Sequence, residues 1–306
     1  MPQATNRRQF LKQATGFTIG LAFTSTALPY ELKAEVIAPV TRWVSDGYLN
    51  KRIRQRILQI KSQNPHLRLG ETHCHSTFSD GNYSIEDLIR RSSYLGLDFL
   101  LITEHQIPKI YPLDRSLLSF QKRLKVYNEW NNTKIPPIRL YPAIETSTQQ
   151  GHLIVVFPEQ YLKQNLYNDL RLTMKPYDSK FCKMDEMAKI ARILGGVTLI
   201  PHPEIERNYP FGAKISFVQK YLLGLVDGIE DISTGHCYEE NFAEKLNIAS
   251  IGSSDDHFNM LIGTTVTVYD SRHHPDFLSA VRAKETQAVK IDDSLRPFLS
   301  AGRLLI

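Results

Sequence analysis

The residues best suited to chemistry in this sequence are histidines that lie at or beside the ends of short apolar runs. The chain has 306 residues and ten histidines. A single histidine next to a strand is usually structural. A larger set with acidic residues between its members is costly to bury without a bound ion, because titratable groups lose hydration on burial. Six histidines follow this pattern, namely His73, His75, His105, His152, His202 and His257.

Two of these histidines are separated by one residue. The segment LGETHCH ends in His73, Cys74 and His75. In an extended strand, residues i and i+2 point to the same side, so the two imidazoles can hold one divalent ion while Cys74 faces the other way. Carboxylates accompany the histidines in the segments FSDG, TEH, AIET and GSSDDH, which contain Asp80, Glu104, Glu145 and Asp255. The sequence therefore indicates a metal site of mixed imidazole and carboxylate ligands.

Strands and helices that alternate along the chain are expected to position these side chains. Apolar runs at 98–103, 138–145, 152–157, 196–201, 227–231 and 248–253 predict strands, and periodic segments at 84–97, 184–194 and 240–246 predict helices. This alternation is typical of parallel strands covered by helices, in an α/β sheet or barrel. The carboxyl ends of such strands meet on one face, where the histidines are expected to converge. Residues 106–137 and 158–183 are interpreted as excursions that wall the site.

The first residues predict an export signal. Arg7 and Arg8 are followed by Phe10, Leu11 and Lys12, and then by a moderately apolar run. This pattern resembles a bacterial twin-arginine signal, and the run is shorter than the roughly 20 residues that a membrane-spanning helix needs. We assign residues 1–34 to this signal and expect the twin-arginine export machinery as a partner. The protein is then expected to be periplasmic or extracellular, with the signal either cleaved or kept as an anchor.

The charge of the chain is unevenly distributed. Residues 1–69 carry 11 Lys and Arg against 3 Asp and Glu, although the whole chain has a net charge of only +5. The rest is therefore mildly acidic, which argues against a long nucleic acid held in a basic groove. Residues 35–66 form a basic helical extension, interpreted as a helix packed across one end of the main domain or as a weak membrane-surface contact. The three cysteines are scattered along the sequence, and one disulfide together with one free thiol is possible.

A known family shares the order of these motifs. The segments HCHSTFSDG, ITEH, AIET, GHLIVVF, IPHP and GSSDDH resemble the motif series of the PHP (polymerase and histidinol phosphatase) family. The resemblance covers most of residues 67–306, which we take as the hydrolase domain. It implies a distorted (β/α)7 barrel, similar to a TIM barrel, with a metal site at the C-terminal ends of the strands. It also implies phosphoester hydrolysis through a metal-bridging hydroxide.

The resemblance further implies how the side chains share the ions. One ion would be held by His73, His75, Glu145 and Asp255, a second by Asp80, His105 and His257, and a third by His152 and His202 with Glu145 as a bridge. Glu145, Asp80 and His257 would thus be catalytic. Mixed ligands of this kind suit two or three divalent ions of Mn, Fe or Zn. The family motif TDH reads TEH here, with Glu104, and the stretch 228–234 lacks an asparagine that is often present.

The expected function is hydrolysis of a small phosphate mono- or diester. Arg207, Lys214 and His236 are candidates to hold the phosphorylated substrate. Two alternatives remain at this point, an exonuclease-like activity on short oligonucleotides and a non-catalytic role in metal binding. Related metal barrels also hydrolyse amides and esters, so the family resemblance is what favours phosphate.

Overall fold

One curled sheet organises the protein. The computed structural model describes residues 47, 49–116, 118–119, 122, 125, 138–163, 167–207, 211–295 and 299, and the predicted export signal lies outside these residues. Within them, the sheet has the strand order β10-β9-β1-β2-β3-β4-β5-β6-β7, with β8 also paired to β6. The strands are β1 (Leu67–Glu71), β2 (Phe99–Gln106), β3 (Arg139–Thr148), β4 (Gly151–Val156), β5 (Val197–Ile200), β6 (Gly228–Ser233), β7 (Tyr238–Glu239), β8 (Ala249–Ser253), β9 (Thr265–Asp270) and β10 (Thr286–Lys290).

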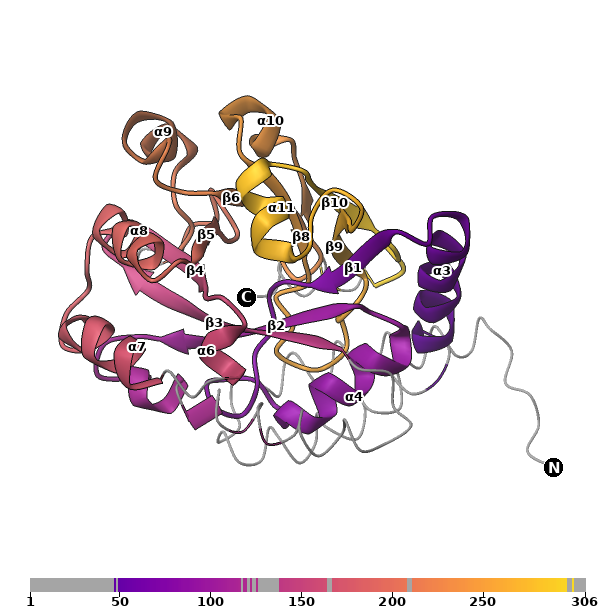
Figure 1. Ribbon diagram of the computed structural model, residues 1–306, viewed down its shortest axis with the longest axis horizontal. Helices are drawn as coiled ribbons and strands as arrows, with labels where there is room; N and C mark the ends of the chain where they lie inside the picture. Colours follow the sequence, from indigo (N-terminus) through magenta and orange to yellow (C-terminus); the bar gives the residue numbers. More distant parts are fainter. Residues whose placement is uncertain are drawn as a thin grey trace.

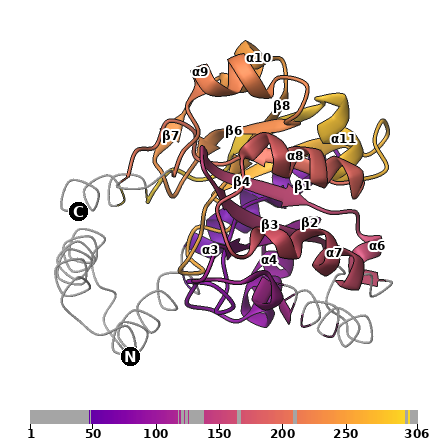
Figure 2. The same cartoon turned by 90° about the vertical axis from the view of Figure 1, so that its left-hand side faces the viewer.

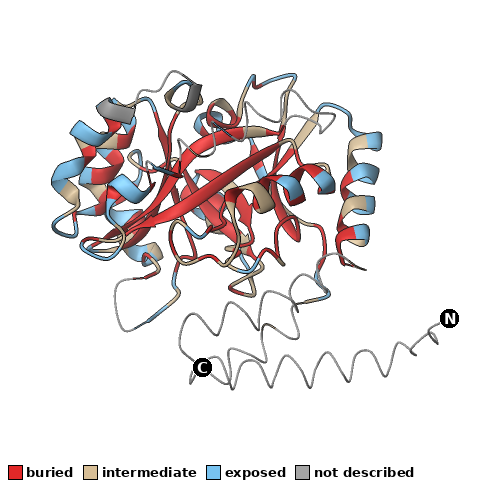
Figure 3. Cartoon of the chain, turned by 90° about the horizontal axis from the view of Figure 1, so that it is seen from below, coloured by how far each residue is buried: buried red, intermediate tan, exposed pale blue. Residues whose placement is uncertain are grey.

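Helices surround this sheet (Figures 1 and 2). They are α3 (Asn50–Gln63), α4 (Ile85–Leu95), α6 (Gln160–Lys163), α7 (Tyr167–Met174), α8 (Met184–Ile193), α9 (Ile215–Phe217), α10 (Phe242–Leu246) and α11 (Phe277–Ala283), with helical turns η2 (Lys175–Tyr177) and η3 (Val218–Leu222). α4 packs on β2, α8 on β4 and β5, and α10 on β6 and β8. In Figure 3 the strands are buried between helices whose outer faces are exposed, as expected for amphipathic helices on a sheet.

The sheet curls far enough that strands distant in the strand order come close to one another. β6 and β8 are parallel neighbours, and the chain after β8 forms a parallel bridge with the chain after β1, between Cys74 and Asp256. The His75 amide donates to the Asp256 carbonyl, and the Asp256 amide donates to the His73 carbonyl. Side chains from strands that are distant in the sheet can therefore face one another across its concave side.

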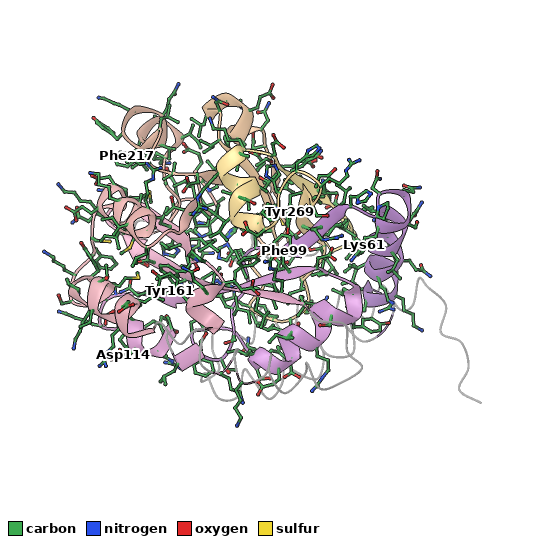
Figure 4. The ribbon with its side chains drawn as sticks, viewed as in Figure 1. Lys61, Phe99, Asp114, Tyr161, Phe217 and Tyr269 are labelled. Atoms are coloured by element: carbon green, nitrogen blue, oxygen red, sulfur yellow. The ribbon has the colours of Figure 1, made fainter. Side chains whose placement is uncertain are left out.

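Alternate residues of the central strands fill that concave side. Phe99 and Leu101 of β2 and Tyr141 and Ala143 of β3 belong to one apolar cluster together with Phe277 of α11. The Phe99 ring lies 5.0 Å from that of Phe277, and Figure 4 shows Phe99 next to Tyr269 in the middle of the fold. α11 also contacts β5, β8 and β9, so this helix lies across the amino-terminal end of the curled sheet.

A glycine makes this packing possible. A Cβ atom at Gly70 would lie only 2.4 Å from the Phe99 ring, which is far below van der Waals contact. The absent side chain therefore lets a large ring fill the interior next to β1, close to the start of the histidine segment.

The helix α3 is held on the barrel by its charged residues as well as by apolar ones. Ile53 and Ile57 are fully buried. Arg52 forms an ion pair of 2.8 Å with the buried Asp292, Lys61 one of 2.7 Å with Asp98, and Arg54 donates to the Tyr94 carbonyl. These contacts support the packed-helix interpretation of the basic extension. Among the described residues, no helix is both long enough and apolar enough to cross a membrane.

The mixed α/β fold with a curled, barrel-like sheet is confirmed, but the predicted all-parallel arrangement is not. β4 is antiparallel to both β3 and β5, and β9 and β10 form an antiparallel edge next to β1. β3 and β4 are joined by a hairpin with no helix between them, so the count of seven βα units is not confirmed. Cys74, Cys182 and Cys237 form no disulfide with one another, so the disulfide that the sequence left open is absent among the described residues.

Candidate metal centre

The proposed ligands lie on the same inward face as the apolar cluster, nearer the carboxyl ends of the strands. On β2 the inward series Phe99, Leu101 and Thr103 continues to His105, and on β3 the series Tyr141 and Ala143 continues to Glu145. Because side chains alternate with a period of two, one strand face supplies apolar packing at its start and polar groups at its end. The paired register of β2 and β3 places His105 beside Glu145.

Four buried atoms face a single point between β1, β3 and β8. Nε2 of His73 and Nε2 of His75 each lie 3.3 Å from Oε2 of Glu145 and 3.3 Å from Oδ1 of Asp255. None of the four atoms has a hydrogen-bond partner among the described residues. Two atoms that are each about 2.1 Å from one ion lie about 3.0–3.4 Å apart at octahedral or tetrahedral angles. The spacing and the missing partners fit a divalent ion.

A second group lies beside the first. Nε2 of His105 is 3.4 Å from Oδ2 of Asp80, and Nε2 of His257 is 3.4 Å from Oδ1 of the same carboxylate. The His75 ring lies between the two histidines, with ring centroids at 4.4 Å from His105 and 4.2 Å from His257. Nδ1 of His105 is 3.0 Å from Oε2 of Glu145, which connects this group to the first.

A third group uses the other oxygen of Glu145. Oε1 lies 2.7 Å from Nδ1 of His152 and 2.9 Å from Nε2 of His202. One carboxylate thus faces two groups of ligand atoms with its two oxygens, as a bridging carboxylate does. The structure brings together all nine side chains that the sequence singled out as ligands.

Charge coupling across the cluster is strong. Burial lowers the pKa of the His73 imidazole, but Asp255 and Glu145 raise it well above its ordinary value. Burial likewise disfavours the Glu145 carboxylate, yet the surrounding imidazoles, led by His105, hold its pKa well below its ordinary value. His202 differs, because burial dominates and lowers its pKa to about 4. Protons therefore balance the carboxylates in the metal-free protein, and divalent ions would displace them.

The backbone is strained at two of the proposed ligands. His202 has φ of 30° and Asp255 has φ of 48°, in the left-handed region that costs a residue with a side chain about 1–3 kcal/mol. Neighbouring hydrogen bonds hold both segments. The His202 amide donates to Glu230, and the Ser254 amide donates to Glu71. Strain of this kind is often found where side chains must be aimed at a ligand.

Three buried glutamates support the ligand segments. Glu71 accepts hydrogen bonds from the amides of Thr72, His73 and Ser254, and burial raises its pKa to about 7. Glu104, the residue that departs from the family motif, accepts from the hydroxyl of Ser79 at 2.6 Å and also from Ser76.

Glu230 is the third of these glutamates, and its carboxylate accepts from Nδ1 of His73 at 2.8 Å. The sequence reasoning did not single out Glu71 or Glu230. The available signal was an acidic residue in a short strand with buried apolar neighbours, with Glu71 as the last residue of β1 and Glu230 within β6.

The three candidate substrate contacts lie at different distances from the cluster. Nε2 of His236 is 2.6 Å from Oδ2 of Asp255, so this buried histidine belongs to the centre and supports a ligand. The Arg207 guanidinium lies over the Phe211 ring at 4.8 Å, and that ring stacks on His202 at 4.0 Å, which places Arg207 at the rim. The exposed Lys214 forms ion pairs with two glutamates of its own surface loop, Glu204 and Glu206.

The centre is open on one side. Side-chain exposure is 34% for Asp80 and 25% for His257, against 1% or less for Glu145 and His202. On the same side, Tyr111 stacks on His105 and the Arg115 guanidinium lies 5.5 Å from the Tyr111 ring. Solvent therefore reaches the cluster through the second group. Sequence reasoning missed both Tyr111 and Arg115.

Comparison with known proteins supports a relation to PHP proteins in one part of the chain. A family model described as PHP-associated matches residues 239–286, from the end of β7 to the start of β10. Among curated proteins none matches the sequence.

Solved structures share the fold at low sequence identity. A two-domain protein from Bacteroides vulgatus that contains a predicted PHP-like metal-dependent phosphoesterase has 19% identity and a TM-score of 0.50, over 73% of this chain and 65% of its own length. PsfC from Pseudomonas syringae has 14% identity and a TM-score of 0.52, over 79% of this chain and 100% of its own length. A putative metal-dependent phosphoesterase from Bifidobacterium adolescentis has 12% identity and a TM-score of 0.45, over 62% and 88% of the two chains. For the first two structures, the likeness is one of fold.

Proposed function

We propose that this protein is a PHP-type metal-dependent phosphoesterase that hydrolyses a small phosphate mono- or diester. The observation that carries the proposal is the convergence of four buried atoms, in which Nε2 of His73 and Nε2 of His75 each lie 3.3 Å from Oε2 of Glu145 and from Oδ1 of Asp255. These are good ligand atoms for a divalent ion. Their burial without hydrogen-bond partners is costly unless an ion compensates them.

Two or three ions of Mn, Fe or Zn fit the three groups of atoms. His73, His75, Glu145 and Asp255 would hold the first. Asp80, His105 and His257 would hold the second, and His152, His202 and Glu145 the third. Harder and softer ions both accept such mixed nitrogen and oxygen ligands. The ligand atoms therefore do not distinguish between Mn, Fe and Zn.

The chemistry follows from the arrangement of the side chains. Bound divalent ions supply Lewis acidity, which lowers the pKa of water and neutralises charge on phosphoryl oxygens. Glu145 fixes the separation between the groups of ligand atoms, because Oε2 faces the first group and Oε1 faces the third. Asp80 and His257 line the open side, where the phosphoryl group would enter. Arg115 and Arg207 at the rim would attract the phosphate by charge, and such exposed contacts contribute modestly.

Export through the twin-arginine route remains part of this proposal, with a periplasmic or extracellular location. That route moves folded proteins, so the centre would receive its metal in the cytoplasm before export. The test compares the native signal with a Sec signal on the same chain. The proposal expects a different metal content in the Sec-routed protein, and identical metal and activity would contradict it.

A phosphate-release screen tests the proposed activity. Purified mature protein is stripped, refilled separately with Mn, Fe or Zn, and assayed with nucleotides, sugar phosphates, short oligonucleotides and bis(p-nitrophenyl) phosphate. His73→Ala and Glu145→Ala should abolish release, while Glu204→Ala, a change of an exposed carboxylate, should not. Release that depends on metal and on both buried residues supports the proposal. Tight metal binding without release from any substrate would favour the non-catalytic alternative.

A further inference from the structure

Glu230 is fully buried and contacts three of the segments that carry proposed ligands. It belongs to β6, between β5 and β8. Oε1 accepts from Nδ1 of His73 at 2.8 Å and from the Ser253 hydroxyl at 2.6 Å. Oε2 accepts from the His202 amide at 2.7 Å and from the Tyr238 hydroxyl at 3.2 Å. A carboxylate offers about four lone-pair sites, and four donors occupy them.

We propose that Glu230 is the positioning residue that assembles the metal centre, by fixing the tautomer of His73 and the backbone of His202. This inference rests on the proposed metal centre and adds to it a residue that touches neither metal nor substrate. A carboxylate only accepts, so the hydrogen of a neutral His73 lies on Nδ1. Nε2 then keeps its lone pair, and this is the atom that faces Glu145 and Asp255 at 3.3 Å.

The same carboxylate holds two further strand ends. The His202 amide donates to Oε2, and this residue has the left-handed φ of 30°. A strained backbone persists when surrounding contacts determine its conformation. The Ser253 hydroxyl donates to Oε1, and Ser253 is the last residue of β8, two before Asp255. Glu230 therefore connects the ends of β1, β5 and β8.

Glu230→Gln tests this arrangement with little change in shape. A glutamine amide has one accepting oxygen and one NH₂ that only donates. If the NH₂ faces the His202 amide, two donors oppose each other and the strained backbone loses its acceptor. If it faces His73, the ring must accept at Nδ1 and carry its hydrogen on Nε2, which then cannot bind metal. Both orientations are expected to weaken metal binding about 10- to 100-fold.

Two control variants separate this effect from general damage. Tyr238→Phe removes one hydroxyl and leaves the carboxylate in place. Glu239→Gln makes the same chemical change at the next strand, on a side chain that is 50% exposed and pairs with Lys290. Both variants should bind metal within about threefold of the unchanged protein, because neither touches the donors of His73 or His202.

The experiment measures zinc affinity by competition with a chelator, and bound zinc by elemental analysis, on the stripped and refilled full chain. ¹⁵N NMR of the zinc-loaded, unchanged protein gives the tautomer of His73, with the signal assigned by its loss in His73→Ala. We expect Nδ1–H on His73, weaker zinc binding in Glu230→Gln, and near-normal binding in both controls. Thermal unfolding shows that Glu230→Gln folds, and the tautomer itself is read on the unchanged protein.

The outcomes distinguish this inference from the proposed function. An unchanged protein that binds no zinc, manganese or iron would overturn the metal centre and this inference with it. An unchanged protein that binds metal, with Glu230→Gln equal to it, would overturn only the positioning role. Nε2–H on His73 in the zinc-loaded protein would also overturn that role.

Discussion

Replacement of Glu145 by glutamine should remove part of the metal centre and leave the rest. Oε2 of Glu145 lies within 3.3 Å of His73, His75 and His105, and Oε1 lies within 2.9 Å of His152 and His202. Glutamine keeps one oxygen and turns an NH₂ toward the other group. It also removes one negative charge from a side chain that is almost completely buried.

The magnitude follows from this burial. Loss of one partner from a buried charge pair costs about 3–5 kcal/mol. Each 1.4 kcal/mol is about a factor of ten in affinity, so the affected ion should bind about 100-fold to about 4,000-fold more weakly. Because one oxygen survives in the amide, we expect the number of tightly bound ions to fall without reaching zero.

Competition titration measures the metal affinity of the Glu145→Gln protein, and elemental analysis measures the number of ions that it binds. The control is Glu204→Gln, because Glu204 is a carboxylate with 41% side-chain exposure on the surface loop beside Lys214. The control should bind ions as the unchanged protein does. An unchanged ion count in Glu145→Gln, with affinities within about threefold, would refute the bridging role of this carboxylate.

Further predictions concern pH, thiols and the docking of α3. Burial lowers the pKa of His257, but neighbouring carboxylates raise it from 6.5 to about 9. Its contribution to metal-free stability is therefore present below pH 6.5 and lost as pH rises through about 9. As pH rises from 6.5 to about 9, the melting temperature of the stripped protein should fall, and that of the zinc-loaded protein should not. An equal dependence of melting temperature on pH in the two forms would contradict this. Thiol labelling of folded protein should modify Cys237 first, because Cys74 is fully buried and burial raises the pKa of Cys182 to about 12. Fast labelling of Cys182, read by mass spectrometry, would be the contrary result. Asp292→Ala should remove the buried anchor of α3 and cost about 1–3 kcal/mol, or about 2–10 °C in Tm; an unchanged melting curve would show that this pair does not hold the helix.

The candidate ligands could be found from the sequence because of where they lie on their strands. His105 and Glu145 come at the carboxyl ends of buried strands, and side-chain alternation places both on the inward face. His73 and His75 are close to the end of β1, and Cys74 lies between them in the apolar core as expected. Strand ends are local features, and parallel packing brings most of them together. His152 reaches the same end of the sheet from the start of β4, because β4 is antiparallel to β3.

Strand direction could not be found in the same way. A run that is buried on both faces has the same composition whether it is parallel or antiparallel, and β4 is buried throughout. Only Gln149 and Gln150 connect β3 to β4. Two residues are too few for the crossover that parallel strands need. The short connection was therefore the available signal for a hairpin.

The residues that support the ligands depend on contacts that are distant in sequence. Glu230 bonds to His73 across 157 positions, and no spacing rule connects them. Lys214 shows the opposite case. It follows the His202 motif closely, but in the structure it pairs with Glu204 and Glu206 on the surface. Sequence proximity to the His202 motif therefore did not distinguish Lys214 from Arg207, which lies at the rim of the centre.

The central claim is that the buried cluster hydrolyses phosphoesters only when it holds divalent ions. The most direct measurement is the rate of phosphate release by stripped protein as manganese, iron or zinc is added in counted equivalents, with bound metal determined in the same samples. We predict no release without metal, then a rise that reaches a plateau at two or three bound ions and is absent in His73→Ala. Release from the fully stripped protein, or no release with three ions bound, would contradict the claim.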